Sequence, residues 1–520
     1  MNVKKTMIAQ IGLCLFAPIF ISCGSDDTTD DTDNGNGTTT TGVTINFPST
    51  TSSSTVGLTS QGTDANEMLS SSKFSNTVTI AFSGTSATVT NSVSGVTYST
   101  SGGAVTITST ASGVNYVVTG TTTNGSLNIT SSNDLMLTLN GASITNTSGA
   151  AITVSSAVNA FVYLPSGTTS TLTDNSSSSA DAAFISSGSL LFSGSGTLSV
   201  AGKNSDAIQA AANVRITDAT INITSAVNDG IQAGTRFVMD SGALSITSSP
   251  TEDYSKGVSV LTGYLIVNDG TININTSASA GMANQYVSDS QSNTDAYSTI
   301  INGGTINITS TSTSAEVEGI ESNHGSVNIN GGTLTIKVTD DAINAESSIN
   351  INGGQIYAYV TGNDGIDSNG TMYITGGTVI AISTAAAPET SLDSDNNTFN
   401  ISGGVVVALT PGAEPTSPSA STQPVVLLGS GSANTIINIQ DGNSKEIITF
   451  LAPYSHANIL ISTPNLSKST SYKLYTGGTV SGGTNFNGLY TSGTYSGGTL
   501  SKSFSTGSSS YTNLRSSTSH

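Results

Sequence analysis

Acidic residues recur at a fixed spacing in a chain that has few charges. Only 9% of the residues are charged, yet an Asp or a Glu occupies the same place in five similar segments. These residues are Asp206, Asp229, Glu318, Asp341 and Asp364. The first two are 23 residues apart, and the last three follow one another at 23 residues as well. A period this constant indicates a structural repeat that places one acid at the same point of each unit.

A second set of polar residues follows the first set by three positions. Its members are Glu321, Asn344 and Asp367, with Asp393 as the expected next member. Asp340 adds a further carboxylate directly before Asp341. If the units stack as strands, equivalent residues lie about 4.8 Å apart. Two carboxylates at that distance repel by roughly 3.5 kcal/mol at an effective dielectric constant near 20. A cation between them is therefore expected.

Ca²⁺ is the cation that fits these residues best, because it accepts about six to eight oxygen ligands with loose geometry. The candidate metal ligands are Glu318, Glu321, Asp340, Asp341, Asp364, Asp367, Asp393, Asp206 and Asp229. An alternative stays open, since an Asp at a turn can instead accept hydrogen bonds from nearby backbone N–H groups. Asp206 and Asp229 have the weaker claim to a metal, because Gln209 and Gln232 follow them in place of acids.

Short strands and tight turns must position these acids. Segments such as "SVNIN" and "SININ" precede a Gly-Gly pair, and strands such as "TLTIKV" and "QIYAYV" follow it. Apolar residues alternate with polar ones in these strands, as half-buried strands require. A third strand at "GIES" or "GIDS" completes the unit. Three short strands in about 23 residues predict one rung of a parallel β-helix, with Asn330 and Asn352 stacked as an amide ladder beside the Gly-Gly turns.

The repeat divides the chain into regions. Residues 43–410 are expected to form the β-helix, with looser early rungs between Val43 and Val200. Residues 411–424 form a loop rich in Pro and Ser, which holds four of the 11 prolines. Residues 425–520 contain short strands without the 23-residue period and are expected to form a β-rich cap over the edge of the last rung.

The N-terminus has the pattern of a targeting segment. Two Lys residues precede an apolar run that is too short to span a bilayer comfortably, so residues 1–22 are interpreted as a signal peptide. The sequence Ile21-Ser22-Cys23-Gly24 resembles a bacterial lipobox, which implies a lipid anchor on Cys23. Residues 23–42 are expected to form a disordered acidic and Thr-rich tether. Ser25-Asp26-Asp27 resembles the export signal of surface lipoproteins, so we predict an outer-membrane lipoprotein exposed on the cell surface, which meets the membrane only through its lipid.

The overall charge excludes one class of partner. The net charge is −20 with only 13 Lys and Arg residues, so nucleic acid is not an expected partner. A cation, or an acidic ligand bridged by a cation, suits this field better. Processing at Cys23 removes Cys14 and lipidates the other cysteine, so neither a disulfide nor a soft-metal site is expected.

Several motifs together resemble a known family. They are the D-[GA]-I-x-[AS] corners, the "INGGT" strands, the "LNGASITNTSGAAI" segment and the closing "GGTVSGGTNFNGLYTSGTYSGGTL". This combination resembles the bacterial carbohydrate-binding domain family with a pectate-lyase-like β-helix. The resemblance implies a right-handed parallel β-helix, calcium at acidic rung corners, and non-catalytic binding of plant-type polysaccharide. By position, it supports Glu318, Asp341, Asp364 and Asp367 as ligands.

Three functions remain open on this fold, because the fold alone does not select among them. The favoured one is calcium-dependent binding of acidic plant-type glycans such as pectin and polygalacturonate, and also of cellulose. Tyr357 and Tyr359 would then offer an exposed apolar strip to the sugar, unless the C-terminal region packs over it. The second function is a polysaccharide lyase, whose basic residue could come from Lys203, Arg215, Arg236, Lys256 or Lys337. The third is a structural surface adhesin.

Overall fold

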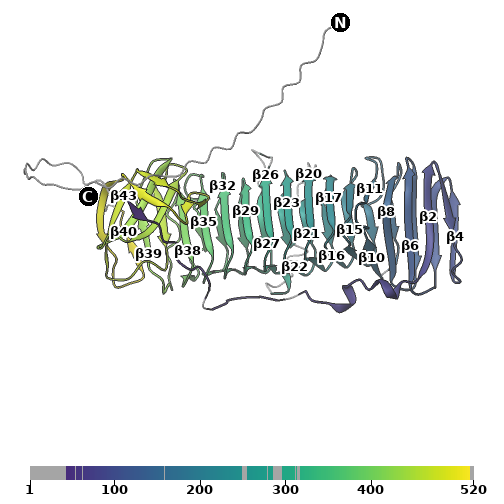
Figure 1. The fold of residues 1–520 in the computed structure, drawn as a ribbon, viewed down its shortest axis with the longest axis horizontal. Helices are drawn as coiled ribbons and strands as arrows, with labels where there is room; N and C mark the ends of the chain where they lie inside the picture. The colour runs from purple at the N-terminus through teal and green to yellow at the C-terminus, as the bar shows by residue number, and fades with distance from the viewer. Residues whose placement is uncertain are drawn as a thin grey trace, which may run out of the picture. The chain divides into compact units, whose positions relative to one another are not determined.

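The computed structural model describes residues 42–515 except 53, 61, 157, 249–254, 278, 285–294, 311 and 313–316. In this part of the chain, the strands wind into a β-solenoid of about 11 turns (Figure 1). Each regular turn adds one short strand to each of three stacks. The parallel β-helix predicted from the repeat is therefore confirmed. The helices of the described part are the short 3₁₀ segments η1 (Ala65–Glu67), η2 (Ser71–Lys73) and η3 (Asp295–Tyr297).

Each regular rung passes through the first, the second and then the third stack. The first stack contains β4 (Val96–Ser101), β5 (Gly103–Ser109), β7 (Gly125–Ser131), β9 (Ile152–Val154), β12 (Ala182–Ser186), β15 (Asp206–Ala210), β18 (Ile231–Ala233), β21 (Lys256–Val260), β24 (Ala280–Asn284), β27 (Glu318–Ser322), β30 (Ile343–Ala345), β33 (Ile366–Ser368) and β36 (Leu392–Asp393). The second stack contains β10 (Asn159–Tyr163), β13 (Ser189–Ser193), β16 (Asn213–Thr217), β19 (Arg236–Met239), β22 (Tyr264–Val267), β25 (Thr299–Ile301), β28 (Ser326–Ile329), β31 (Ser348–Ile351), β34 (Thr371–Ile374) and β37 (Phe399–Ile401). The third stack contains β11 (Thr169–Thr173), β14 (Thr197–Ala201), β17 (Thr220–Ser225), β20 (Ala243–Ser248), β23 (Thr271–Thr276), β26 (Thr305–Ser310), β29 (Thr333–Val338), β32 (Gln355–Val360), β35 (Thr378–Ser383) and β38 (Val405–Thr410).

Ladders of branched apolar side chains fill the interior of the solenoid. One ladder in the third stack follows a single register position through six successive strands, and none of its side chains is exposed. Its members are Ile221, Leu244, Ile272, Ile306, Leu334 and Ile356. Each fully buried side chain of this size contributes roughly 1.5–3 kcal/mol. Because a rung covers this surface only with the help of its neighbours, the rungs stabilise one another.

Amide side chains line the turns between the second and third stacks. The Nδ2 group of Asn352 donates to Oδ1 of Asn330 at 2.8 Å, and Asn330 donates to Asn302 at 2.9 Å. Asn302 in turn donates to Asn268 at 2.8 Å. The predicted amide ladder of Asn330 and Asn352 is therefore confirmed, and it extends two rungs further back. Gly354, in the turn after Asn352, has a φ of 83°, which a residue without Cβ adopts without strain.

Antiparallel pairs close the first rungs. β4 pairs antiparallel with β5, and β2 (Asn76–Gly84) pairs antiparallel with β3 (Ser86–Thr90). β2 also pairs in parallel with β6 (Val114–Thr122), and β6 pairs with the long strand β8 (Leu135–Thr145). The two halves of β8 then pair with β10 and β11, so that one long strand begins both the second and the third stack.

Residues 425–515 form a C-terminal cap, which is yellow-green to yellow in Figure 1. Its strands are β39 (Val425–Leu428), β40 (Thr435–Asp441), β41 (Glu446–Ala452), β42 (Asn458–Ser462), β43 (Ser471–Thr476), β44 (Thr479–Ser481), β45 (Asn485–Phe486), β46 (Leu489–Tyr490), β47 (Thr494–Ser496), β48 (Thr499–Ser505) and β49 (Tyr511–Asn513). β42 pairs antiparallel with β38 and with β39, so the last strand of the third stack has a partner on its outer edge. A paired edge cannot recruit a foreign strand.

The segment before β2 is not part of the rungs. Residues 42–75, with 53 and 61 outside the described part, run along the solenoid from the cap to the first rungs, and we call this segment the strap (Figure 1, purple). Its first strand, β1 (Val43–Thr44), pairs antiparallel with β47 of the cap. The expectation that rungs begin at Val43 is therefore wrong. The first strand of the solenoid is β2, which begins at Asn76.

The strap covers outward-facing apolar side chains of the second stack, which explains its path. Leu58 packs against Val238, Ile266 and Ile300, whose side chains are fully buried although they belong to the outer face. The strap also satisfies polar groups, because the N–H of Leu58 donates to Oδ1 of Asn328 at 3.0 Å. Without this cover, the second stack would expose a continuous apolar surface.

The predicted signal peptide (1–22), the predicted lipid-anchor residue Cys23 and nearly all of the predicted tether (23–42) lie outside the described residues. Within the part of the chain that the structure describes, no helix has the length and hydrophobicity needed to cross a membrane.

Candidate metal centre

The first stack aligns the predicted acids into two columns. In the outer column, the strand register pairs Glu321 with Asn344, Asn344 with Asp367, and Asp367 with Asp393. These residues come from β27, β30, β33 and β36, and their side chains are partly exposed except for Glu321, which is 9% exposed. The stacking that the 23-residue period predicts is confirmed, and Asp393 is the next member of the column.

The inner column lies at the corner where each rung enters the first stack. Its Asp side chains are buried, and each accepts a hydrogen bond from the backbone of the next rung. The bonds run from Asp229 N to Asp206 Oδ1 (2.9 Å), from Lys256 N to Asp229 Oδ1 (2.7 Å), from Asp364 N to Asp341 Oδ1 (2.9 Å) and from Thr390 N to Asp364 Oδ1. One carboxylate oxygen of each Asp therefore caps a backbone N–H, as the alternative interpretation proposed.

The second oxygen has an amide donor in three of these four rungs. Gln209 donates to Asp206 Oδ2 at 3.4 Å, Gln232 donates to Asp229 Oδ2 at 3.2 Å, and Asn344 donates to Asp341 Oδ2 at 3.0 Å. In each case the donor is the outer-column residue of the same rung. Asp206, Asp229 and Asp341 therefore have both oxygens hydrogen-bonded, which accounts for them without a metal.

Glu321 has a cation from the chain itself, and the charge of the same Lys256 opposes the upward shift that burial imposes on the pKa of Glu318. The ammonium group of Lys256 lies 2.9 Å from Glu321 Oε2 and 2.8 Å from the hydroxyl of Ser279. Lys256 is 5% exposed and occupies the inner column, since its register partner Ala280 pairs in turn with Glu318. The 23-residue period does not predict this role of Lys256. The signal was present, because "KGVSV" has the pattern of "DGIQA" with Lys in the place of Asp.

Asp364, Asp367 and Asp393 form a group of a different kind, and we call it the acidic cluster. One carboxylate oxygen from each of the three lies within 4.8 Å of the other two. The rung of Asp364 differs from those of Asp206, Asp229 and Asp341 because its outer-column residue is Asp367, an acid rather than an amide. Among the described residues, no Lys or Arg forms a salt bridge with the cluster.

The electrostatics of the cluster reflect this crowding. Burial raises the pKa of Asp364 to about 7, with a further upward contribution from the carboxylates of Asp393 and Glu389 and an opposing one from the N–H of Thr390. Burial also raises the pKa of Asp367 to about 7, and the charges of Asp364 and Asp393 add to that shift. Near neutral pH the cluster therefore holds its negative charge at a cost in free energy that a bound cation would offset.

The residues of the cluster fit a calcium ion. Asp367 Oδ1 is buried and has no hydrogen-bond partner within the described part of the chain, so this carboxylate has an unused acceptor. All donor atoms of the cluster are carboxylate oxygens, which suit a hard cation. Asp393 is held in place, because its Oδ1 accepts bonds from Ser394 N at 2.7 Å and Thr416 Oγ1 at 2.7 Å.

The remaining predicted residues lie elsewhere. Asp340 is not in the acidic cluster, and its Oδ1 accepts a bond from Asn363 at 2.6 Å. The exposed apolar strip predicted at Tyr357 and Tyr359 does not exist. Tyr357 is 8% exposed, and Tyr359 stacks on Tyr454 of the cap with ring centroids 5.3 Å apart. The apolar face of β32 and β35 is large, so the cap packs over it, which was the alternative that the sequence left open.

Comparisons with known proteins place the chain in a family. Residues 101–363 match the family model described as carbohydrate-binding domain-containing protein. Among solved structures, a polysaccharide lyase-like protein from C. thermocellum, determined as a gadolinium derivative, is 20% identical with a TM-score of 0.37, and the match covers 53% of this chain and 96% of that one. A likeness at this level bears on neither ligand nor activity. No curated protein gives a significant match. Because the family match spans half of the sequence, the chain belongs to the carbohydrate-binding domain-containing protein family.

Proposed function

We propose that this protein binds acidic polysaccharide through calcium held at the acidic cluster, without cleaving the polymer. Family membership supports carbohydrate as the ligand class. The observation that carries the finer proposal is the cluster of Asp364, Asp367 and Asp393, three carboxylates with an unused buried acceptor and no basic partner among the described residues. Calcium would bind these carboxylates and, when bound, would attract the carboxylate groups of an acidic glycan.

Amides of the outer column offer the polymer polar contacts next to the cluster and farther along the solenoid. Asn344 lies on the rung next to Asp367, and Gln209 and Gln232 lie on earlier rungs. These three side chains are partly exposed, whereas Ser259, Ala283 and Glu321 between them are buried. Amide groups both donate and accept hydrogen bonds, so they suit the hydroxyl groups of sugars. The chain would therefore contribute a calcium-dependent anchor and weaker polar contacts.

Three of the five basic residues considered for a lyase are held in ion pairs, which supports binding over cleavage. A lyase needs a base that removes a proton from the sugar ring. Arg215 and Arg236 form ion pairs with Glu67 at 2.9 and 2.6 Å, and Lys256 forms one with Glu321. A protonated side chain held in an ion pair is a poor base.

We also propose that the protein is a cell-surface lipoprotein anchored through Cys23. The basic and apolar segment before the lipobox-like sequence supports this location. Metabolic labelling with a fatty-acid analogue tests it, because Cys23→Ser should abolish labelling. Protease treatment of intact cells would then show whether the protein faces outward.

Retention on immobilised polygalacturonate tests the binding function. We expect retention in calcium, loss of retention in a chelator, and at least about a tenfold weaker interaction for Asp367→Asn. Glu346→Gln is the matched control. It removes a negative charge from the turn between β30 and β31, outside the acidic cluster. Retention that a chelator leaves unchanged would refute calcium dependence. Release of unsaturated sugar products would show that the protein is a lyase.

A further inference from the structure

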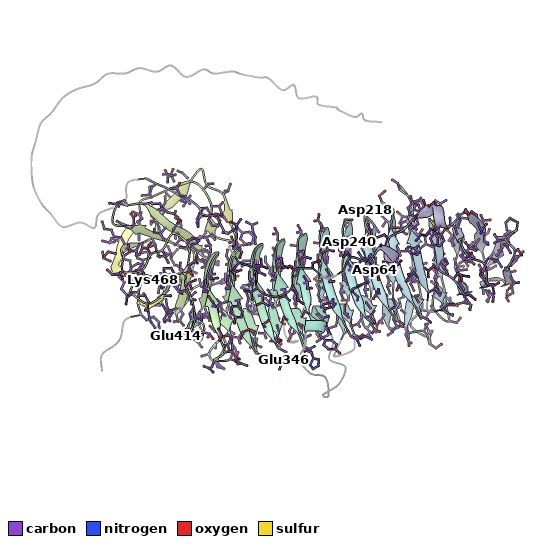
Figure 2. The ribbon with its side chains drawn as sticks, turned by 90° about the horizontal axis from the view of Figure 1, so that it is seen from below. Asp64, Asp218, Asp240, Glu346, Glu414 and Lys468 are labelled. Carbon is purple, nitrogen blue, oxygen red and sulfur yellow. The ribbon has the colours of Figure 1, made fainter. Side chains whose placement is uncertain are left out.

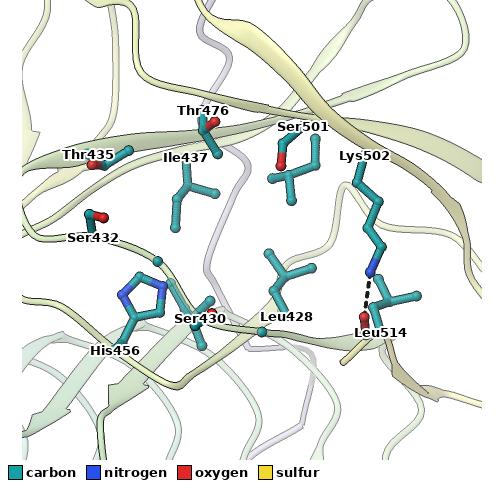
Figure 3. Close-up of a pocket in the computed structure, with 14 residues that line it drawn as sticks. Leu428, Ser430, Ser432, Thr435, Ile437, His456, Thr476, Ser501, Lys502 and Leu514 are labelled. Atoms are coloured by element: carbon teal, nitrogen blue, oxygen red, sulfur yellow. Dashed lines mark hydrogen bonds between the residues drawn. The ribbon is translucent and has the colours of Figure 1, made fainter. Parts of the chain in front are cut away.

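A cavity of about 320 Å³ opens in the C-terminal cap, and none of its lining residues belongs to the acidic cluster or to the outer column (Figure 3). It lies between β39 and β42 on one side and β40, β43 and β48 on the other. This volume is at the lower end of the range for ligand sites, about 300–1,000 Å³, so the cavity suits a small molecule and not a polymer segment.

The floor and the rim of the cavity differ in chemistry. Leu428, Ile437 and Ile459 form an apolar floor, and each is at most 5% exposed. Hydroxyl groups of Ser432 and Ser501 lie at the exposed rim, with further Ser and Thr side chains beside them (Figure 3). A ring with one C–H face and several hydroxyl groups matches this division, because apolar surface meets the floor while the hydroxyls reach the rim.

Lys502 supplies a positive charge at the rim. Its ammonium group donates to the backbone oxygen of Leu514 at 2.5 Å, which leaves further N–H donors free for a ligand. Within the described part of the chain, no carboxylate forms a salt bridge with Lys502. In a protein with a net charge of −20, an exposed ammonium group without an acidic partner favours an anionic group on the ligand.

His456 forms a wall of the cavity that is fixed and neutral. The backbone N–H groups of His456 and Gly431 donate to each other's carbonyl oxygens at 3.1 and 3.0 Å. Nδ1 of His456 donates to the carbonyl oxygen of Tyr454 at 3.2 Å, and burial lowers the pKa of the ring. A Cβ atom on Gly431 would lie 2.6 Å from the ring, so glycine is required for this approach. Lys502 is therefore the cationic group of the cavity.

We propose that this cavity binds a single sugar residue that carries a carboxylate, such as a uronic acid. The carboxylate would pair with Lys502, the ring hydroxyls would bond to the Ser and Thr side chains at the rim, and the C–H face would rest on the apolar floor. This site needs no calcium and does not rest on the function proposed for the acidic cluster.

Saturation-transfer NMR of the mature protein with free galacturonate tests this site. The measurement is made in chelator, so that a calcium-dependent site does not contribute. We expect binding of galacturonate, weaker binding of galactose, and about a tenfold or greater loss of galacturonate affinity in Lys502→Met. Lys468→Met is the control, because Lys468 is an exposed lysine of the same cap that does not line the cavity.

Ser501→Trp is a second variant, which places a large side chain over the rim and should abolish binding of both sugars. Ser501 is exposed, so this change leaves the core of the cap intact. Absence of galacturonate binding to the unmodified protein would overturn the proposal. So would equal losses in Lys502→Met and Lys468→Met, or unchanged binding in Ser501→Trp. Retention on polygalacturonate in calcium should be the same in all three variants, which separates this site from the acidic cluster.

Discussion

Asp367→Asn should change the stability of the protein in opposite directions with and without calcium. The pKa of Asp367 is raised from 3.8 to about 7, so its charged form destabilises the fold. The stability that the protonated form provides is fully present below the ordinary pKa and is lost as the pH rises through about 7. At pH 8 a shift of about three units corresponds to roughly 4 kcal/mol, which solvent screening of a partly exposed group reduces to about 2 kcal/mol.

In chelator at pH 8, the neutral amide of the variant removes this penalty, and we expect the variant to be about 2 kcal/mol more stable than the unmodified protein. In calcium the order should reverse. A ligand at 100 times its Kd stabilises the folded state by about 2.7 kcal/mol, and a variant that has lost a carboxylate ligand gains little of this. Urea unfolding at pH 8, with and without calcium, measures both differences. Glu346→Gln serves as the control and should shift neither curve by more than about 0.5 kcal/mol.

The difference between the results in chelator and in calcium is what tests calcium binding. If Asp367→Asn destabilises the protein equally in chelator and in calcium, then Asp367 supports the fold through its hydrogen bond from Asn344, and the acidic cluster is not a metal site. If the variant is more stable under both conditions, the carboxylates repel one another but calcium does not bind.

Three further predictions concern the cluster, the strap and the rungs. Calcium affinity, measured by calorimetry, should fall about tenfold per pH unit between pH 7 and 5 for each proton that calcium must displace, because protons compete for carboxylates with a pKa of about 7. An affinity that does not change with pH would contradict ligation by the cluster. Glu67→Gln should lower the free energy of unfolding by about 3 kcal/mol, since it leaves the buried guanidinium of Arg215 without one of its anionic partners. Asp64, which Figure 2 labels, lies at the exposed end of the same ion-pair group, so Asp64→Asn should change the free energy of unfolding by less than about 1 kcal/mol. Gly319→Ala should destabilise the solenoid by at least about 2 kcal/mol in urea unfolding, because the new Cβ would lie 2.3 Å from a backbone oxygen of the next rung. Gly429→Ala is the control and should be nearly neutral, because nothing lies within 4 Å of the Cβ that it adds.

The sequence predicts the rungs well because their signal is periodic. Glu318, Asp341 and Asp364 mark one register position, and the structure stacks their rungs as the spacing requires. The sequence also contains the information that shows which acids lack a hydrogen-bond donor. The residue three positions on is an amide after Asp341 and an acid after Asp364, and that difference decides whether the second oxygen has a donor.

Other features could not be predicted, because irregular spacing between the repeats leaves the strand register undetermined in the sequence. Lys256 occupies the inner column, but the segments on both sides of it depart from the 23-residue period, so its position opposite the Glu residues could not be counted from the sequence. The strap has no period at all. Its partners, such as Asn328 and Asn352, are more than 250 positions away. The available clue was the second stack, where strands such as "YLIV" are apolar on both faces and so require a cover.

The path of the strap brings the two limits of the described chain to the same end of the solenoid. Val43 pairs with Tyr495 in the cap, and Arg515 forms an ion pair with Glu414 beside the last rungs. A mechanical pull between these two points would pass through the cap and leave most of the rungs unloaded. Any support attached before residue 42 would hold the molecule by its cap, so that the β4–β5 hairpin forms the free pole.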